Sequence, residues 1–306
     1  VWTSFGTMYI LDFNNGAVGL PPATDNTWTG ALDNDWFNPG NWTANAVPVA
    51  EDVFIPVTAK GNPVILGGGA TTGALTVLPG AGLTVATFGE LTTNGLFTND
   101  GDFVIESDNI GYSGSFIDLG GLAGGGTYSF NRDFLNFAPY GDPGGWHYIS
   151  TPVDDFQTHD MFDYFVNGWD AMTQMWFHYE GTVTPQGQPC VPGANVPMAP
   201  MEAWSAKWDQ TYATGTNFLG FPDDCEVMYP GTDLIIEFDG PFAAVNTGGY
   251  GPMAIDPGWN FVGNPYSSDM DPALVAFGPS TIAAVAFWDG WFGNYEYWTG
   301  TVPLAT

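Results

Sequence analysis

The segment from residue 62 to residue 134 is built from short apolar runs, and Gly, Asn, Thr or Asp follows each run closely. Examples are ALTVL, LTVATF, DFVIES and SFIDL. The runs are too short for an independent hairpin sandwich, and their turns recur too regularly for ordinary loops. This spacing predicts a few coils of a parallel β-solenoid, in which each coil buries its apolar run against its neighbours. A small antiparallel sandwich is the alternative fold for this segment.

Two segments further along the chain are near copies of each other. DPGGWHYISTPVDD at 142–155 corresponds to DPGWNFVGNPYSS at 256–268. A second match, WFHYEGTV at 176–183 against YEYWTGTV at 295–302, follows in the same order. Two ordered matches indicate duplicated modules, and their alternating pattern is typical of strands. The predicted fold class is therefore all-β, with tandem β-sandwich modules after the N-terminal domain.

These sequence patterns predict that the chain has four parts. They are an N-terminal extension over 1–26, a Trp-rich segment with the solenoid-like domain over 27–137, a first sandwich module over 138–253 and a second over 254–306. The second module is expected to be incomplete, because only four residues follow Val302, whereas the first copy continues well beyond the same point.

An incomplete sandwich exposes an open strand edge, which favours pairing with another strand. The alternating segment TMYILDF, with apolar residues Met8, Tyr9, Ile10, Leu11 and Phe13, is predicted to be the strand that completes it. Donation between chains would give a head-to-tail filament, and donation within one chain would join its two ends. A third possibility is that the segment only forms an edge of its own domain.

The charge of the chain is strongly negative, with 33 acidic residues against three basic ones and a formal net charge of -30. Phosphate binding requires Lys and Arg, so this composition excludes nucleic acid and anionic membranes as partners. No apolar run is long enough for a membrane span, and membrane insertion is not expected. The acidity is explained either by solubility in a salty medium or by the binding of divalent cations.

Candidate metal ligands lie in the short acidic clusters of the turns. Asn99, Asp100 and Asp102 in the sequence NDGD are the preferred candidates for a structural Ca²⁺, because closely spaced oxygen ligands suit that ion. A plain polar turn is the alternative, and the spacing of an EF-hand is absent. No other cofactor is predicted.

The sequence contains no recognisable catalytic pattern. The three histidines, His147, His159 and His178, have no nucleophile at a known spacing, and two of them lie in alternating strands beside aromatic residues. A glycosidase needs only two carboxylates, but nothing in the sequence singles out a pair. We therefore expect that the protein is not an enzyme.

Cys190 and Cys225 lack the short paired spacing of a zinc site and are predicted to form a disulfide, with two buried thiols as the alternative. A disulfide implies an oxidising compartment. The chain begins without an apolar signal core, which is expected of a mature exported chain whose signal peptide has been removed.

Several motifs together resemble the large multidomain surface and secreted proteins of Bacteroidota that use type IX secretion. The motifs are WTG at Trp28–Gly30, NPGNW at Asn38–Trp42, EDV at Glu51–Val53, and the repeated segments Gly145–Pro152 and Gly258–Tyr266. The resemblance implies export, assembly or attachment outside the cell, and an adhesive or structural role.

The expected function is therefore that of an extracellular structural protein that self-assembles into a surface filament or sheath by strand complementation. The alternative is a monomeric surface adhesin that binds polysaccharide. In that case Trp288, Trp291 and Tyr295 in FWDGWFGNYEYW would stack on sugar rings.

Overall fold

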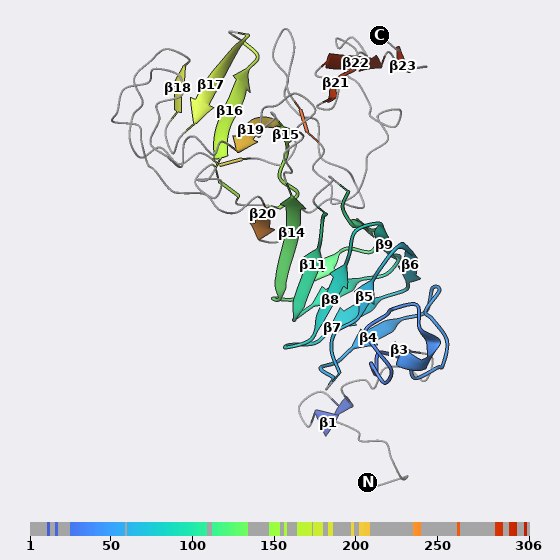
Figure 1. Ribbon diagram of the computed structural model, residues 1–306. Coiled ribbons are helices and arrows are strands. Elements are labelled where there is room, and N and C mark those ends of the chain that lie inside the picture. Colours follow the sequence, from blue (N-terminus) through green and yellow to red (C-terminus); the bar gives the residue numbers. More distant parts are fainter. Residues whose placement is uncertain are drawn as a thin grey trace.

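The computed structural model describes residues 25–58, 60–108, 112–133 and 147–153 as long stretches, together with shorter strands and bridges between residues 11 and 304 (Figure 1). The described residues form strands and one short 3₁₀ helix, η1 Pro39–Asn41, and they include no α-helix. The prediction of an all-β fold is confirmed.

Three sheets of parallel strands run along a short β-solenoid of about three turns, and each turn contributes one strand to each sheet. The first sheet contains β3 Asn26–Thr27, β4 Val53–Ile55, β7 Leu75–Val77, β10 Phe97–Asn99 and β13 Leu122–Ala123. The second contains β5 Val64–Ile65, β8 Gly82–Val85, β11 Asp102–Ile105 and β14 Thr127–Asp133. The third contains β6 Gly68–Thr72, β9 Gly89–Thr93 and β12 Ser115–Asp118. The parallel register decides for the solenoid and against the antiparallel sandwich.

Successive side chains of a strand point to opposite faces of its sheet. Each apolar run therefore buries alternate side chains in the solenoid core. Equivalent positions stack from coil to coil, as Ile65, Val85 and Ile105 do in the second sheet. Phe103 packs edge to face against Phe116, with ring centroids 4.9 Å apart, and Phe97 is 5.1 Å from Phe103. This geometry is the one that aromatic pairs prefer.

Inward-facing polar residues in the third sheet are hydrogen-bonded within the coils. Thr93 and Asp118 are backbone partners, and Thr93 Oγ1 donates to Asp118 Oδ1 at 3.2 Å. The same oxygen accepts the backbone N–H groups of Gly120 and Gly121 at 3.0 and 2.9 Å. The Asp118 carboxylate thus accepts hydrogen bonds from the backbone of the turn that follows β12. Buried polar groups need such partners.

Three tryptophans close the first end of the solenoid. Trp28, Trp36 and Trp42 are all buried, and Trp42 meets the other two edge to face with centroid distances of 5.1 and 4.7 Å. Trp42 Nε1 donates to the carbonyl of Trp36 at 2.7 Å. Asn41 is also fully buried, and its Oδ1 accepts the N–H groups of Leu32 and Asp33. We call residues 25–42 the Trp cap.

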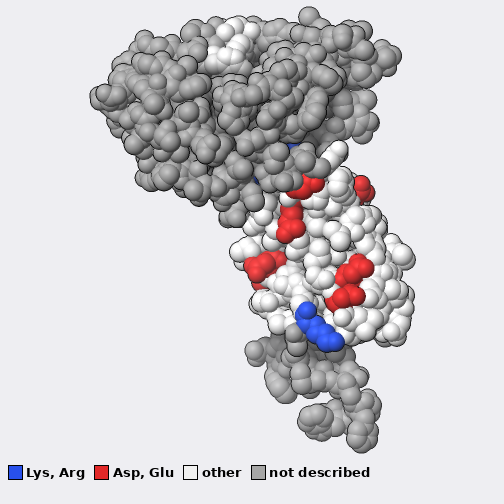
Figure 2. Space-filling view, viewed as in Figure 1, with Lys and Arg blue, Asp and Glu red and all other residues white. Residues whose placement is uncertain are grey.

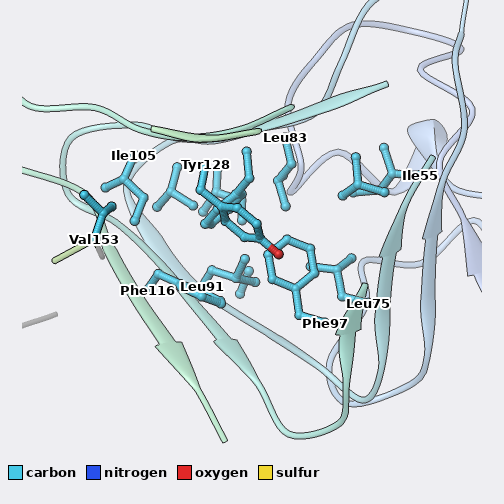
Figure 3. Close-up of a cluster of buried hydrophobic side chains, with 14 of the residues drawn as sticks. Ile55, Leu75, Leu83, Leu91, Phe97, Ile105, Phe116, Tyr128 and Val153 are labelled. Carbon is cyan, nitrogen blue, oxygen red and sulfur yellow. The ribbon is translucent and has the colours of Figure 1, made fainter. Parts of the chain in front are cut away.

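Residues from beyond the solenoid cover its other end. β20 Ile235–Asp239 pairs antiparallel with β14 and extends the second sheet. Val153 is fully buried and lies beside Ile105 and Phe116 (Figure 3). Ile149 and Phe156 belong to the same apolar core. Within the described residues, the solenoid therefore shares one core with the first copy of the repeated motif and with Phe156, which follows it.

The remaining described strands are antiparallel. A five-stranded sheet has the order β15 His147–Ile149, β19 Trp204–Trp208, β16 Tyr164–Asp170, β17 Met175–Tyr179 and β18 Val183–Pro185. A three-stranded sheet contains β21 Val285–Asp289, β22 Asn294–Trp298 and β23 Pro303–Leu304. β1 Leu11–Asp12 and β2 Gly16–Ala17 form a two-stranded pair.

The two copies of the repeated motif contact each other. Gly263 lies so close to Ser150 that a Cβ atom on Gly263 would be 2.2 Å from the Ser150 Cβ. Both residues hold the same place in the motif, one after the matched pair Ile149 and Val262. Val262 also forms an isolated antiparallel bridge with Glu202. The second copy therefore packs on the first.

Candidate functional site

The outer face of the third solenoid sheet carries two rows of side chains that follow from its register. One row is Gly69, Glu90 and Ser115, and the other is Thr71, Thr92 and Ile117. The rows are fixed because parallel strands in register place equivalent residues above one another. The face is therefore an ordered array rather than a set of independent side chains.

Large apolar residues line both borders of this face. Leu66, Phe88 and Tyr112 lie in the three turns that lead into β6, β9 and β12, and Leu96 and Leu119 lie in the turns that leave β9 and β12. With Ile117, these residues are between 43% and 66% exposed. We call the outer face of β6, β9 and β12 together with these turn residues the β6–β9–β12 flank.

Phe88 has an unusual backbone conformation, with φ at +62° in the left-handed region. A bulky residue adopts this region rarely and at a cost in free energy. The Phe88 carbonyl accepts the N–H of Gly68 at 3.0 Å, which ties the turn to the neighbouring coil. Its ring lies 4.7 Å from that of Tyr112, with a tilt of 41°. The geometry holds an aromatic side chain at the surface although burial would be favourable.

Tyr112 is fixed by its own turn. Its N–H donates to Asp108 Oδ1 at 3.0 Å, and the N–H of Asp108 donates to the Tyr112 carbonyl at 2.8 Å. The two aromatic residues on this border thus belong to turns with defined hydrogen bonds.

Charge is sparse on the strands of the flank. Glu90 is the one exposed charged residue of β6, β9 and β12, because Asp118 is buried. Glu106 and Asp108 stand at the border, in the turn that leads to Tyr112. Acidic side chains elsewhere on the described surface form separate patches with uncharged surface between them (Figure 2).

The predicted Ca²⁺ ligands have protein partners in the structure. Asn99 is buried, and its Oδ1 accepts the N–H of Gly101 while its Nδ2 donates to the Thr127 carbonyl. Asp102 Oδ1 accepts the Thr127 hydroxyl at 2.6 Å, and Asp100 Oδ1 accepts the N–H of Gly125 at 3.2 Å. These contacts are those of a polar turn between coils. Among the described residues, no group of three or more His, Cys, Asp or Glu side chains is placed to hold a metal ion.

Several predicted sites fall partly or wholly outside the described residues. Of the predicted assembly strand, Leu11 is described and pairs with Ala17, whereas Met8, Tyr9, Ile10 and Phe13 lie outside. Cys190 and Cys225 also lie outside, so their pairing stays a prediction. Trp288 and Tyr295 are direct backbone partners in β21 and β22, and Trp291 is not among the described residues.

The Trp cap contains two carboxyl groups whose pKa values are shifted by their surroundings. Hydrogen bonds from Asn41 and Asn38 and from the Asp35 N–H hold the pKa of Asp33 below its ordinary value of 3.8. Burial and the nearby charge of Asp52 raise the pKa of Asp25. These shifts indicate that the cap depends on ionised Asp33.

Two further pKa shifts belong to the solenoid. Burial raises the pKa of Glu51, but the N–H donors of Val49 and Ala50 outweigh it and the net shift is downward. Burial, followed by the charge of Asp118, raises the pKa of Tyr128 to about 12. Tyr128 belongs to the buried core, whereas the Glu51 carboxylate accepts hydrogen bonds from Asn26, Val49 and Ala50 before β4.

The described fold defines a class of protein, namely an all-β chain in which a capped parallel β-solenoid is joined to antiparallel sheets. The chain belongs to a protein family described as a domain of unknown function (DUF8693), which matches residues 27–290. The matched region runs from β3 through β21 and covers the solenoid and the five-stranded sheet together. No curated protein and no solved structure matches the chain. Within the described residues, no helix is long and apolar enough to cross a membrane.

Sequence reasoning did not identify the β6–β9–β12 flank. Its apolar residues are not adjacent in the sequence, and each one resembles an isolated residue in a turn. The available signal was positional, because Leu66, Phe88 and Tyr112 each stand shortly before a strand of the same sheet. Aligning the coils on their strands would have placed the three residues within one position of each other.

Proposed function

We propose that this protein is an extracellular structural protein that assembles into a filament or sheath by strand complementation between subunits. One observation carries the proposal. β1 has β2 as its partner among the described strands, and it lies at the opposite end of the ribbon from β21, β22 and β23 (Figure 1). A strand at one end and a small sheet at the other suit head-to-tail contact between copies.

The terminal sheet offers a place for an added strand. Among the described strands, β21 and β23 each pair with β22 alone, so both are edges of a three-stranded sheet. β23 has two residues and begins with Pro303, which cannot donate to a ladder, whereas β21 is longer and has the apolar sequence VAFWD. We infer that the edge of β21 accepts the donated strand, because strand addition satisfies its backbone groups.

A location outside the cell and the absence of enzymatic activity belong to the same proposal. The acidic composition, the two cysteines and the resemblance to exported surface proteins support the location. The tight hydrogen bonding of the inward polar residues, such as Asp118 and Asn99, supports a structural role. The partner in this proposal is another copy of the same chain.

Removal of the donated strand tests the proposal. A chain without residues 1–13 is compared by electron microscopy and sedimentation velocity with the full chain, with full-length Leu11→Pro and with full-length Leu11→Val. We expect filaments from the full chain and Leu11→Val, and no filaments from Leu11→Pro and the shortened chain, because Pro removes a ladder donor. Filaments from Leu11→Pro, or a full chain that stays monomeric at high concentration, would refute strand donation.

A carbohydrate-binding adhesin is the second candidate function. The observation behind it is that Trp288 and Tyr295 are direct backbone partners on adjacent strands, since aromatic residues are the ones that stack on sugar rings. Isothermal titration with neutral and acidic oligosaccharides, comparing the full chain with Trp288→Ala, tests this function. Sugar binding by a monomeric protein that Trp288→Ala abolishes would favour the adhesin over the filament.

A further inference from the structure

We draw no further inference here: the strongest candidate, the outer edge of β6 in the third solenoid sheet, beyond which the described residues include no neighbouring strand, carries none because nothing in the structure shows what pairs with it.

Discussion

Ser150 and Gly263 show at the residue scale why the repeated motif occurs twice. Ser150 follows a buried Ile149 in the first copy, and Gly263 follows an exposed Val262 in the second. Glycine is needed in one of the two copies, because two Cβ atoms do not fit between these backbones.

Substituting Gly263→Ala should therefore lower the thermal unfolding temperature. The new Cβ would lie 2.2 Å from that of Ser150, and overpacking of this kind typically costs about 1 to 3 kcal/mol. The double variant Gly263→Ala and Ser150→Gly should recover most of the loss, because it moves the Cβ to the other side of the contact. Gly125→Ala is the control, since no atom lies within 4 Å of its added Cβ. A double variant as unstable as the single one would show that the contact is not the cause.

The Trp cap illustrates how one structural element depends on a few polar groups. Asn41 Nδ2 donates to Asp33 Oδ1 at 2.5 Å and to the Asp35 carbonyl at 2.9 Å. The buried Asn41, which precedes Trp42, thus fixes the chain between Trp28 and Trp36. A buried amide whose bonds are lost costs about 1 to 3 kcal/mol, so the cap is sensitive to each partner.

This dependence predicts an acid-sensitive cap. The pKa of Asp33 is lowered in the folded state, so its stabilising contribution is present above the ordinary value of 3.8 and is lost as pH falls through the folded pKa. The unfolding temperature of the wild type should therefore decrease below that pH, as followed by tryptophan fluorescence. Asp33→Asn should be less stable at pH 6 and should show a smaller decrease in acid. Parallel pH curves for the two proteins would contradict the role assigned to Asp33.

For the whole molecule, the main question is how the solenoid and the antiparallel sheets are joined. β20 extends the second solenoid sheet, and Val153 fills the end of the solenoid core. The family match from residue 27 to residue 290 also treats both regions as one unit. The open end of a solenoid must be covered, and here the first copy of the repeated motif covers it.

We expect Val153→Ala to destabilise both regions together. Removing two buried methyl groups should cost about 1.5 to 3 kcal/mol. Hydrogen exchange should show faster opening in β11 and β12 and also in β15. Val49→Ala, at a position that is 73% exposed, is the matched control and should change stability by less than about 0.5 kcal/mol. Faster exchange in only one of the two regions would mean that they fold independently.

The sequence by itself determined the properties that depend on local pattern and on composition. Short apolar runs with regular turns are compatible with few folds, so residues 62 to 134 indicated a β-solenoid, with a small antiparallel sandwich as the alternative, without knowledge of any contact. The repeated motif and the net charge of -30 are likewise direct properties of the chain. The hydrogen-bond partners of Asn99, Asp100 and Asp102 needed the structure, because a carboxylate in a turn has the same sequence signal whatever it contacts. Their binding of Ca²⁺ stays a prediction.

Only the tertiary structure decided how distant segments meet. The pairing of β20 with β14, the burial of Val153 against Ile105, and the contact between Gly263 and Ser150 each join residues that are far apart in the sequence. The β6–β9–β12 flank also exists only after the coils stack in register, since its apolar residues come from separate turns. The physical reason is the same in each case. Local sequence sets which side chains a strand turns inward, whereas long-range pairing and the closure of the core set what each strand faces.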